Sequence, residues 1–406
     1  MGLKSKARRL NVFRVIVVVI LLLAFGAVFI VGINIGNGRL SVRFPWQTKP
    51  VASSLPAKLD YTSVNQVYQA LKTNYDGKLT ETELLNGLKT GLAAAPGDPY
   101  TDYFTPSEAK AFNNELNNSF SGIGAELSQD SNGNIEVISP ISGTPAAKAG
   151  LQPLDLIAEI NGVSTAGMSA DEAVTKIRGT AGTKVILQIV RNHTQTINLT
   201  ITRQNITVPS VTTKILPGNI GYMAISTFAD DTSGLAQKAA SQFASQNVKG
   251  IILDLRNDPG GLLNAAVDVS SLWLPQGQTI MQEKRGNTVV QTYYAQGGDV
   301  LHGIPTVVLI NSGSASSSEI TTGALHDNSD AYVIGQKSFG KGVVQQLISF
   351  GDGSQLKVTV ASWYRPNGQD IEHQGITPDK TILDSGTDLV APNDPQLQAA
   401  QTYLNK

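Results

Sequence analysis

The chain of 406 residues contains no cysteine and only four histidines. The absence of cysteine excludes a disulfide framework, a cysteine nucleophile and thiolate metal sites. Acidic and basic residues number 32 and 31, and the resulting formal net charge of -1 gives no reason to expect nucleic-acid binding. With 39 glycines, 18 prolines and 41% hydrophobic residues, the composition is typical of a loop-rich globular protein, whose length predicts two or three domains.

The four histidines do not support a Ser-His-Asp triad. His193, His302 and His373 fall in predicted turns or loops with no acid-and-nucleophile arrangement around them. His326 and Asp327 are neighbours on a predicted helix, where adjacent side chains point in different directions. The sequence also contains no His-x-x-x-His motif and no dense group of carboxylates, so we expect no metal site.

One long apolar run stands near the N-terminus. Residues 15–35 carry no charge, and at about 1.5 Å per residue they can cross a hydrocarbon core of roughly 30 Å. Residues 1–14 form a basic tail, which the positive-inside rule leaves in the cytoplasm. A cleaved signal peptide usually has an apolar region of about 7–15 residues before an Ala-x-Ala exit, which is absent here. We therefore expect a retained single-pass helix in the cell membrane, with everything after about residue 38 in the periplasm or the extracellular space.

Two segments on either side of the main body are predicted to be helical. Prolines and serines mark a linker at 36–57, after which the apolar spacing from 58 to 118 becomes helical. Such a region usually packs against the main domain or against a second copy of the chain, and the pattern leaves both open. The segment 385–406 is predicted to be a tail containing a short helix.

The segment 119–204 changes to short alternating apolar runs separated by turns, interrupted by two short helical stretches. This order resembles a PDZ domain, in which a peptide C-terminus adds a strand to an exposed edge and backbone amides of a glycine loop bind its carboxylate. That loop would be Gly122-Ile123-Gly124, although an isolated Gly-x-Gly more often forms only a turn. One departure is Leu154, which stands where a glycine normally precedes Asp155.

Strands and helices alternate through the segment 205–384, which predicts an α/β core with a partly parallel sheet. In such folds the binding and catalytic residues lie at the carboxyl ends of the strands. Two loops stand at such ends, one beginning at Asp254 and the other containing the serines of 312–318. The small residues around these serines allow a sharp turn that exposes a hydroxyl.

A lysine downstream can serve as the base for a serine. Lys341 lies between two glycines with apolar residues nearby, and a lysine acts as a base only if burial lowers its ordinary pKa of about 10.4. Taken alone, Lys341 is better interpreted as a surface lysine in a hairpin. A P-loop at 335–342 is rejected, because no Ser or Thr follows the lysine and the next residues are strand-like.

Several motifs together resemble the C-terminal processing peptidases, the S41 family of serine peptidases. They occur in the family order and are Asp98-Pro99-Tyr100, Asp254-Leu255-Arg256, Gly313 to Glu319, Gly340-Lys341-Gly342 with Gln345, and Gly375 to Asp379. Composition alone does not choose among Ser314, Ser316, Ser317 and Ser318. The resemblance implies Ser316 as nucleophile, Lys341 as base and Gln345 as the residue that orients the pair.

The resemblance also implies an oxyanion hole, a substrate and a regulatory contact. The oxyanion would be bound by backbone amides of Gly260, Gly261 and Ser317, where Ser317 replaces a usual alanine, and Arg178 is a candidate regulatory residue. The implied enzyme is a membrane-anchored serine endopeptidase that needs no cofactor and cleaves proteins near C-termini captured by the PDZ domain. The alternative is a catalytically silent, membrane-anchored PDZ scaffold.

Overall fold

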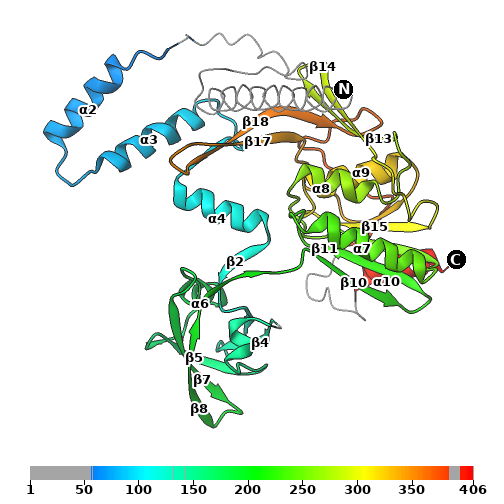
Figure 1. The fold of residues 1–406 in the computed structure, drawn as a ribbon, viewed down its shortest axis with the longest axis horizontal. Helices are drawn as coiled ribbons and strands as arrows, with labels where there is room; N and C mark the ends of the chain where they lie inside the picture. The colour runs from blue at the N-terminus through cyan, green and yellow to red at the C-terminus, as the bar shows by residue number, and fades with distance from the viewer. Residues whose placement is uncertain (1–55, 57, 131, 142, 384–393, 406) are drawn as a thin grey trace, which may run out of the picture. The chain divides into compact units, whose positions relative to one another are not determined.

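The structure is a computed structural model that describes residues 56, 58–130, 132–141, 143–383 and 394–405 (Figure 1). The predicted membrane-spanning segment 15–35 lies outside these residues, as does nearly all of the predicted linker. Across the part of the chain that is described, no helix has both the length and the apolar character needed to cross a membrane. The chain divides into two compact units, Met1–Gly77 and Lys78–Lys406.

The unit boundary falls inside the predicted helical region. In the first unit the structure describes one helix, α2 (Thr62–Asn74). The second unit opens with α3 (Glu81–Ala94), β1 (Asp102–Phe104) and α4 (Pro106–Leu116). The helix predicted to begin at Thr105 is α4, where the Thr105 hydroxyl accepts from the Glu108 N–H and the Glu108 carboxylate accepts from the Thr105 N–H.

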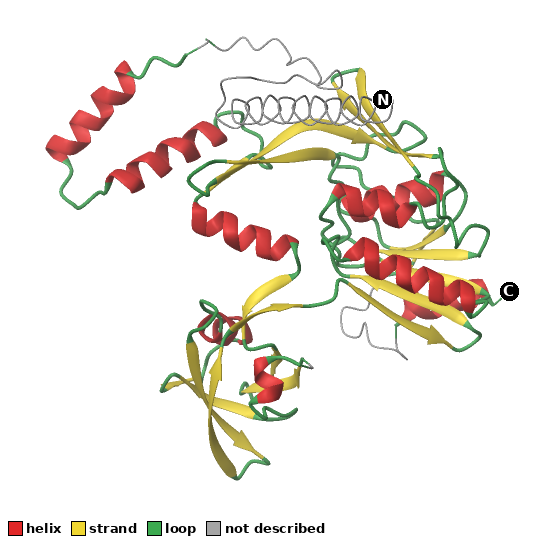
Figure 2. Ribbon diagram, viewed as in Figure 1, coloured by secondary structure: helices red, strands yellow, loops and turns green. Residues whose placement is uncertain are grey.

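A β-rich domain follows, with a six-stranded antiparallel sheet in the order β3-β4-β5-β7-β8 and β6 paired to β5 (Figure 2). Its elements are β3 (Ala125–Gln129), β4 (Ile135–Pro140), α5 (Pro145–Lys148), β5 (Leu156–Ile160), β6 (Val163–Ser164), α6 (Ala170–Ile177), β7 (Lys184–Arg191) and β8 (Gln195–Thr202). The strands β2 (Ser119–Gly122) and β9 (Gln204–Thr207) pair where the chain enters and leaves the domain. Leu154 takes a φ of 67°, so it adopts the left-handed conformation that a glycine would supply.

The second large domain is built on a six-stranded sheet in the order β10-β11-β12-β15-β16-β19. All neighbouring pairs are parallel except β10 with β11, as the alternation of strands and helices predicts. The strands are β10 (Val211–Leu216), β11 (Ile220–Ile225), β12 (Gly250–Asp254), β15 (Thr306–Ile310), β16 (Tyr332–Gly335) and β19 (Lys380–Thr381).

Helices cover both faces of this sheet. On one face, buried side chains of α7 (Thr232–Ser245), α8 (Leu263–Ser270) and α9 (Ser317–Asp327) form a single core with the sheet. On the other face, Leu397 and Ala400 of α10 (Pro395–Leu404) pack against β12 and β15. The predicted C-terminal helix is therefore part of this core, which continues beyond residue 384.

A separate antiparallel sheet contributes strands to the same unit. Its order is β1-β18-β13-β14 with β17 paired to β18, and its remaining strands are β13 (Thr279–Arg285), β14 (Thr288–Tyr294), β17 (Val343–Ser349) and β18 (Gln355–Tyr364). Strand β1 comes from the segment between α3 and α4, so the region before the β-rich domain is tied to strands more than 250 residues later, with Asp102 opposite Lys357.

Two loops meet at the carboxyl edge of the parallel sheet. Strand β12 runs parallel to β15 with Asp254 beside Leu309, so the loops at 255–262 and 311–316 leave the sheet next to each other. The Ala315 N–H donates to the Asp258 carbonyl at 3.0 Å, which joins the two loops directly. This edge is where the sequence places the candidate chemistry.

Candidate active site

The serine-rich loop after β15 separates one serine from the others. The hydroxyls of Ser314, Ser317 and Ser318 donate to backbone carbonyls, at 2.7 Å to Leu255, 3.1 Å to Gly261 and 3.0 Å to Asp258. All three residues are at least 99% buried. Ser316 is partly exposed, and within the described residues its hydroxyl donates to no carbonyl. Three hydroxyls of the loop are thus bound to carbonyls. Within the part of the chain that is described, the hydroxyls of Ser316 and of the exposed Ser312 are not, and of these two residues only Ser316 lines the cavity described below.

The backbone at Ser316 is held in an unfavourable conformation. Its φ of 51° and ψ of −113° lie outside the regions that a residue with a Cβ ordinarily occupies. Residues in such conformations gather at functional sites, where the surrounding structure holds them in place. Here the turn lies directly before α9, so the Ser316 side chain stands at the N-terminus of that helix.

Lys341 lies in the loop before β17. Burial is the largest cause that lowers the pKa of its ammonium, and the positive charge of Lys357 lowers it further. Glu372 and Glu319 act in the opposite direction. The Lys341 Nζ lies 5.3 Å from the centroid of the Tyr100 ring, and within the described residues no hydrogen bond joins it to the Ser316 hydroxyl. In this conformation the lysine therefore contacts an aromatic face.

A buried carboxylate links the loop of the serine to the loop of the lysine. Glu319 is 1% exposed. Its Oε2 accepts from the Ser316 and Lys341 amides, each at 2.9 Å. Its Oε1 accepts from the Gly340 amide at 2.7 Å and from the Ser338 hydroxyl at 2.5 Å. One side chain thus fixes the backbone of both candidate residues.

Two further hydrogen bonds hold the backbone of the loop that carries Lys341. The indole of Trp363 in β18, which is 1% exposed, donates to the Lys341 carbonyl at 2.8 Å. The Glu372 carboxylate accepts from the Gly342 amide at 2.5 Å. The amide of Gln345, in β17, donates to the Tyr100 carbonyl, so Tyr100 contacts both predicted residues, Lys341 through its ring and Gln345 through its backbone.

The predicted oxyanion amides lie beside Ser316, but one of them is occupied. A Cβ added to Gly260 would lie 2.8 Å from the Ser316 Cβ and 2.8 Å from the Ser317 nitrogen, which shows how closely the two loops approach. The Gly260 N–H donates to Asp258 Oδ1 at 2.8 Å. Within the described residues, the N–H groups of Gly261 and Ser317 donate to no partner. Two of the three predicted amides are therefore free to bind an anion.

Asp258 is fully buried at 0% exposure, and its Oδ2 has no hydrogen-bond partner among the described residues. Burial raises the pKa of this carboxyl to about 8, against the opposing effect of the Gly260 amide. A neutral carboxyl at pH 7 removes a negative charge from the position where an oxyanion would form. The sequence shows Asp258 only as a loop residue, and its burial is what distinguishes it.

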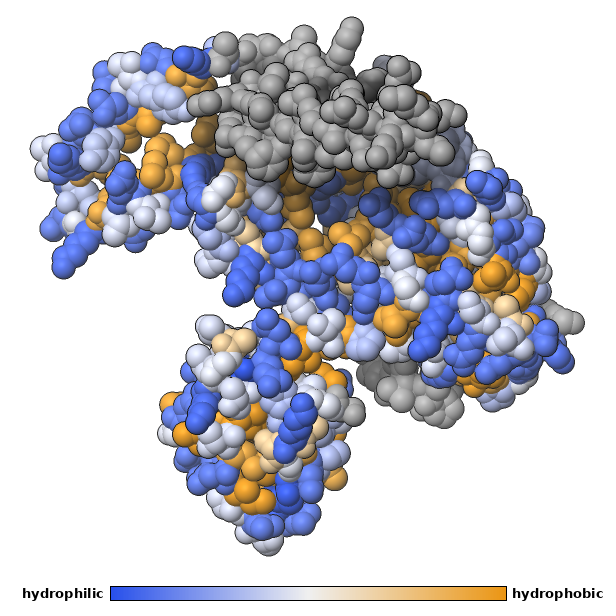
Figure 3. All heavy atoms as spheres, in the orientation of Figure 1, coloured by the Kyte–Doolittle hydropathy of each residue, from blue (hydrophilic) through white to orange (hydrophobic). Residues whose placement is uncertain are grey.

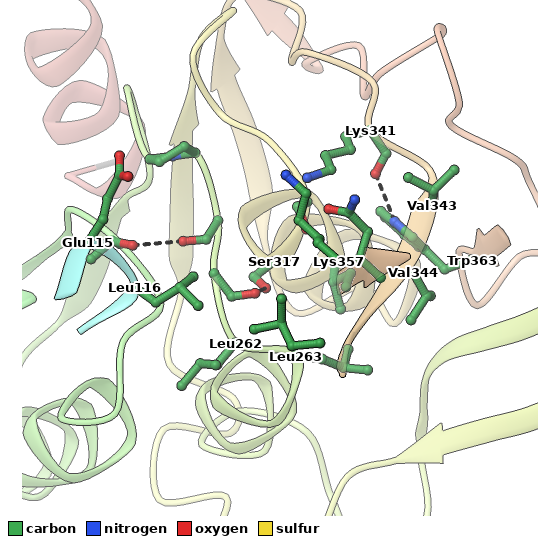
Figure 4. A pocket seen from close by; sticks show the side chains of 18 of the residues that line it. Glu115, Leu116, Leu262, Leu263, Ser317, Lys341, Val343, Val344, Lys357 and Trp363 are labelled. Carbon is green, nitrogen blue, oxygen red and sulfur yellow. Dashed lines mark hydrogen bonds between the residues drawn. The ribbon is translucent and has the colours of Figure 1, made fainter. Parts of the chain in front are cut away.

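Ser316, Lys341, Gln345 and the loop residues Gly260, Gly261 and Ser317 line one cavity of about 340 Å³, shown in Figure 4. Its polar groups are few, and Ser316, Lys341, Gln345 and Lys357 supply four of them. The remaining wall is mainly apolar and is formed by Leu116, Leu262, Leu263, Ile320, Val343, Val344, Leu347 and Trp363. The arrangement fits an acyl group with an apolar side chain held beside a nucleophile.

The predicted carboxylate-binding loop is formed in the β-rich domain. Ile123 is 3% exposed, and its carbonyl accepts from the Ala146 amide at 2.8 Å. Gly124 has a φ of 78°, and a Cβ there would lie 2.5 Å from the Thr144 Cβ, so only glycine fits. Within the described residues the Ile123 and Gly124 amides donate to no partner. Arg178 is exposed at the end of α6, with its guanidinium 5.0 Å from the centre of the Phe120 ring.

Comparison with known proteins places these features in a family. The model of Peptidase family S41 matches residues 219–382, and that of the PDZ domain matches residues 114–190. The carboxy-terminal processing protease CtpA of Bacillus subtilis is 36% identical over 397 residues, covering 98% of this chain and 81% of its own length. A CtpA-like serine protease of Staphylococcus saprophyticus is 39% identical over 320 residues, covering 79% of this chain and 65% of its own length.

A solved structure supports the fold. The crystal structure of a protein assigned to the S41 proteases of Bacteroides fragilis superimposes with a TM-score of 0.58 at 16% identity, covering 87% of this chain and 99% of that one. At that identity the likeness concerns the fold alone. The relationship to the Bacillus protein extends over nearly the whole chain. The protein therefore belongs to the S41 family of serine peptidases, with the carboxy-terminal processing proteases as its relatives, and it carries a PDZ domain.

Proposed function

We propose that this peptidase cleaves peptide bonds with a Ser316–Lys341 dyad. The observation that carries the proposal is that Ser314, Ser317 and Ser318 are buried and donate to carbonyls, whereas Ser316 is partly exposed and lines the same cavity as Lys341. Burial lowers the pKa of Lys341, which increases the fraction of amine that can accept a proton at neutral pH.

The reaction is an acyl transfer in two stages. The Lys341 side chain turns from the Tyr100 ring toward Ser316 and accepts the hydroxyl proton while the Ser316 oxygen attacks the peptide carbonyl. The peptide C–N bond then breaks, and the departing amine takes the proton from Lys341. Water attacks the resulting ester while Lys341 accepts its proton; the bond between the acyl carbon and the Ser316 oxygen then breaks, Lys341 returns the proton to that oxygen, and the new carboxyl end of the substrate leaves.

The negative charge that forms on the carbonyl oxygen is stabilised by backbone amides. The free N–H groups of Gly261 and Ser317 stand closest to this role. The Gly260 N–H already donates to Asp258. The proposed part of Gly260 is therefore to allow its loop to lie close to Ser316, where a side chain would not fit. Gln345 is proposed to orient Lys341 once its amide leaves the Tyr100 carbonyl.

Substrates are proposed to be proteins or peptides with a free C-terminus. The unpartnered Ile123 and Gly124 amides, next to Gly122 at the end of β2, can bind a terminal carboxylate as in peptide recognition by strand addition. The guanidinium of Arg178, at the end of α6, contacts the ring of Phe120, which precedes this loop. On this ground Arg178 is proposed as a regulatory residue that responds to a peptide bound in the loop. The apolar wall of the cavity favours an apolar side chain next to the cleaved bond.

The enzyme is also proposed to be membrane-anchored, with its catalytic part outside the cytoplasm. The uncharged run at 15–35 after a basic tail supports this topology. Self-association through the helical region is supported by Leu85, Leu88 and Leu92 of α3, which are 45–56% exposed. Figure 3 shows apolar (orange) surface in the region of α3. Protease accessibility of the intact cell and light scattering of the purified chain test these two points.

Digestion assays on the full chain test the proposed chemistry. Wild type should cleave a tailed peptide, whereas Ser316→Ala and Lys341→Ala should retain less than about one-thousandth of the rate. Ser312→Ala is the matched control, since Ser312 is an exposed serine of the same loop, and it should cleave normally. Equal cleavage by all variants would disprove the dyad. Equal cleavage of free and amidated tails would disprove capture of the terminal carboxylate.

A further inference from the structure

A second lysine lines the cavity beside the candidate base. Lys357 belongs to β18, and both Lys341 and Lys357 are among the residues that enclose the cavity. In Figure 4 the two side chains extend into the same part of the cavity with their amines at the ends. Lys357 is close enough to Lys341 to lower the pKa of that lysine, second only to burial.

Two aromatic rings hold the Lys357 ammonium in place. Phe104 and Phe112 stack with their centroids 4.8 Å apart, and the Lys357 Nζ lies 5.1 Å from the first centroid and 5.4 Å from the second. The faces of aromatic rings attract a cation. Within the described residues this ammonium forms no ion pair within 4.0 Å, and the nearby carboxylate of Asp98 interacts with it from farther away, since the charge of Lys357 lowers the pKa of Asp98.

The charged groups that face Lys341 come from several elements. Glu319 approaches from α9 and Glu372 from the loop after β18, and both favour the charged form of the lysine. Tyr100 presents its ring face, which also attracts a cation. Against these three groups, Lys357 is the cation that disfavours the charged form. Without Lys357, burial would be the one remaining effect named here that lowers the pKa of Lys341, against two carboxylates and an aromatic face that favour its charged form.

We infer that Lys357 is a positioning residue for catalysis, which keeps Lys341 uncharged by like-charge repulsion while Phe104 and Phe112 hold its own ammonium at the cavity wall. This inference rests on the proposed role of Lys341 as the base. A neighbouring cation is one of the known ways to activate a lysine amine. The sequence alone conceals the arrangement, because Lys357 comes near Lys341 through the pairing of β17 with β18, and Phe104 comes near Lys357 through the pairing of β1 with β18.

A different role for Lys357 would be to bind a carboxylate of the substrate. That role requires the ammonium to point into open solvent or toward the PDZ loop. Its two aromatic contacts instead direct the charge along the wall that Lys341 shares. The two roles differ in what they change. Repulsion changes the titration of Lys341, whereas carboxylate binding changes the KM for substrates with a free tail.

The test measures the titration of Lys341 separately from activity. In the full chain carrying Ser316→Ala, competitive acetylation by acetic anhydride across pH is followed at Lys341 by peptide mapping and mass spectrometry. Lys357→Met and Lys357→Gln should move the acetylation curve of Lys341 to higher pH, and Lys357→Arg should leave it in place. Lys214→Met is the matched control, since Lys214 also stacks on an aromatic ring, at 4.5 Å from Tyr222, but does not line the cavity.

Activity is then measured in the same Lys357 variants with Ser316 intact. In Lys357→Met the acid limb of the kcat/KM profile should move to higher pH in parallel with acetylation, and kcat/KM at pH 7 should fall on the order of tenfold. If neither Lys357→Met nor Lys357→Gln moves the acetylation curve, the inference is overturned. It is also overturned if only the KM for free-tailed peptides rises. If acetylation moves and the activity profile does not, the coupling of the two lysines stands and the proposed dyad fails.

Discussion

Glu319→Gln tests whether one buried carboxylate holds the two halves of the site together. The wild-type carboxylate accepts four hydrogen bonds, two on each oxygen, from donors at 2.5–2.9 Å. An amide of the same shape has one oxygen and one NH2 group, so it can accept on one side only. The least costly orientation keeps the oxygen on the Ser316 and Lys341 amides and turns the NH2 toward Gly340 and Ser338.

The expected loss of stability follows from what this orientation leaves unpaired. The Ser338 hydroxyl can rotate, but the Gly340 N–H is buried and faces another donor, and an unpaired buried amide costs about 1–3 kcal/mol. Two remaining hydrogen bonds also lose the assistance of a charge. Burial raises the pKa of Glu319, so the neutral amide recovers part of the cost of burying the anion. We expect a net loss of about 1–3 kcal/mol, a large share of a typical total of about 5–15 kcal/mol.

Urea denaturation of the full chain measures this loss, with Glu108→Gln as the matched control. Glu108 makes the same capping arrangement at the start of α4, but it is exposed, so its substitution should cost less than about 1 kcal/mol. The folded Glu319→Gln protein should also lose activity, because the loop of Lys341 loses the hydrogen bond that the Gly340 N–H donates to residue 319. If Glu319→Gln were as stable and as active as Glu108→Gln, the clamp would not have the role assigned to it.

Three further substitutions test other parts of the site and core. Burial raises the pKa of Asp258 to about 8 from an ordinary 3.8, so stability should fall by on the order of 1.4 kcal/mol per pH unit between about pH 4 and 8, where the carboxyl is ionised in the unfolded chain but still protonated in the folded one. Asp258→Asn should flatten this slope in urea denaturation at pH 5 and pH 8, and an unchanged slope would contradict the assignment. Asp394→Ala removes one of two carboxylates from Arg256, whose ion pairs at 2.6 and 2.8 Å are almost fully buried, and should destabilise the core by on the order of 3 kcal/mol in thermal or urea unfolding. Gly261→Ala would bring a Cβ within 2.2 Å of the Phe228 carbonyl, so peptide cleavage should be lost, and a fully active variant would refute the tight fit of this loop.

The layout of the catalytic domain could be predicted from the sequence because parallel α/β folds have few solutions. The alternation of strands and helices predicts a parallel sheet, and that sheet brings the loops after β12 and β15 together at one edge. The position of Ser316 among four serines could not be predicted from composition. It depends on which hydroxyls find carbonyl partners, and those carbonyls belong to Leu255, Gly261 and Asp258 in another loop.

The roles of the remaining site residues depend on contacts between residues far apart in the sequence, and no local sequence pattern predicts these contacts. Glu319 is an ordinary N-terminal helix acid in the sequence, and its role follows from the amides of Gly340 and Lys341, more than 20 residues later. The pairing of β1 with β18, which no local pattern predicts, brings the segment of Tyr100 close to the strand of Lys357. The engagement of the Gly260 amide by Asp258 likewise appears only when the loop conformation is known.

Active-site labelling of the full chain tests the central claim most directly. A fluorophosphonate forms a stable bond with a serine that a nearby base has activated, and peptide mapping identifies which serine carries it. Our account predicts a label on Ser316 at pH 7 and its loss in Lys341→Ala. A label on Ser314, Ser317 or Ser318, or undiminished labelling of Ser316 in Lys341→Ala, would contradict it.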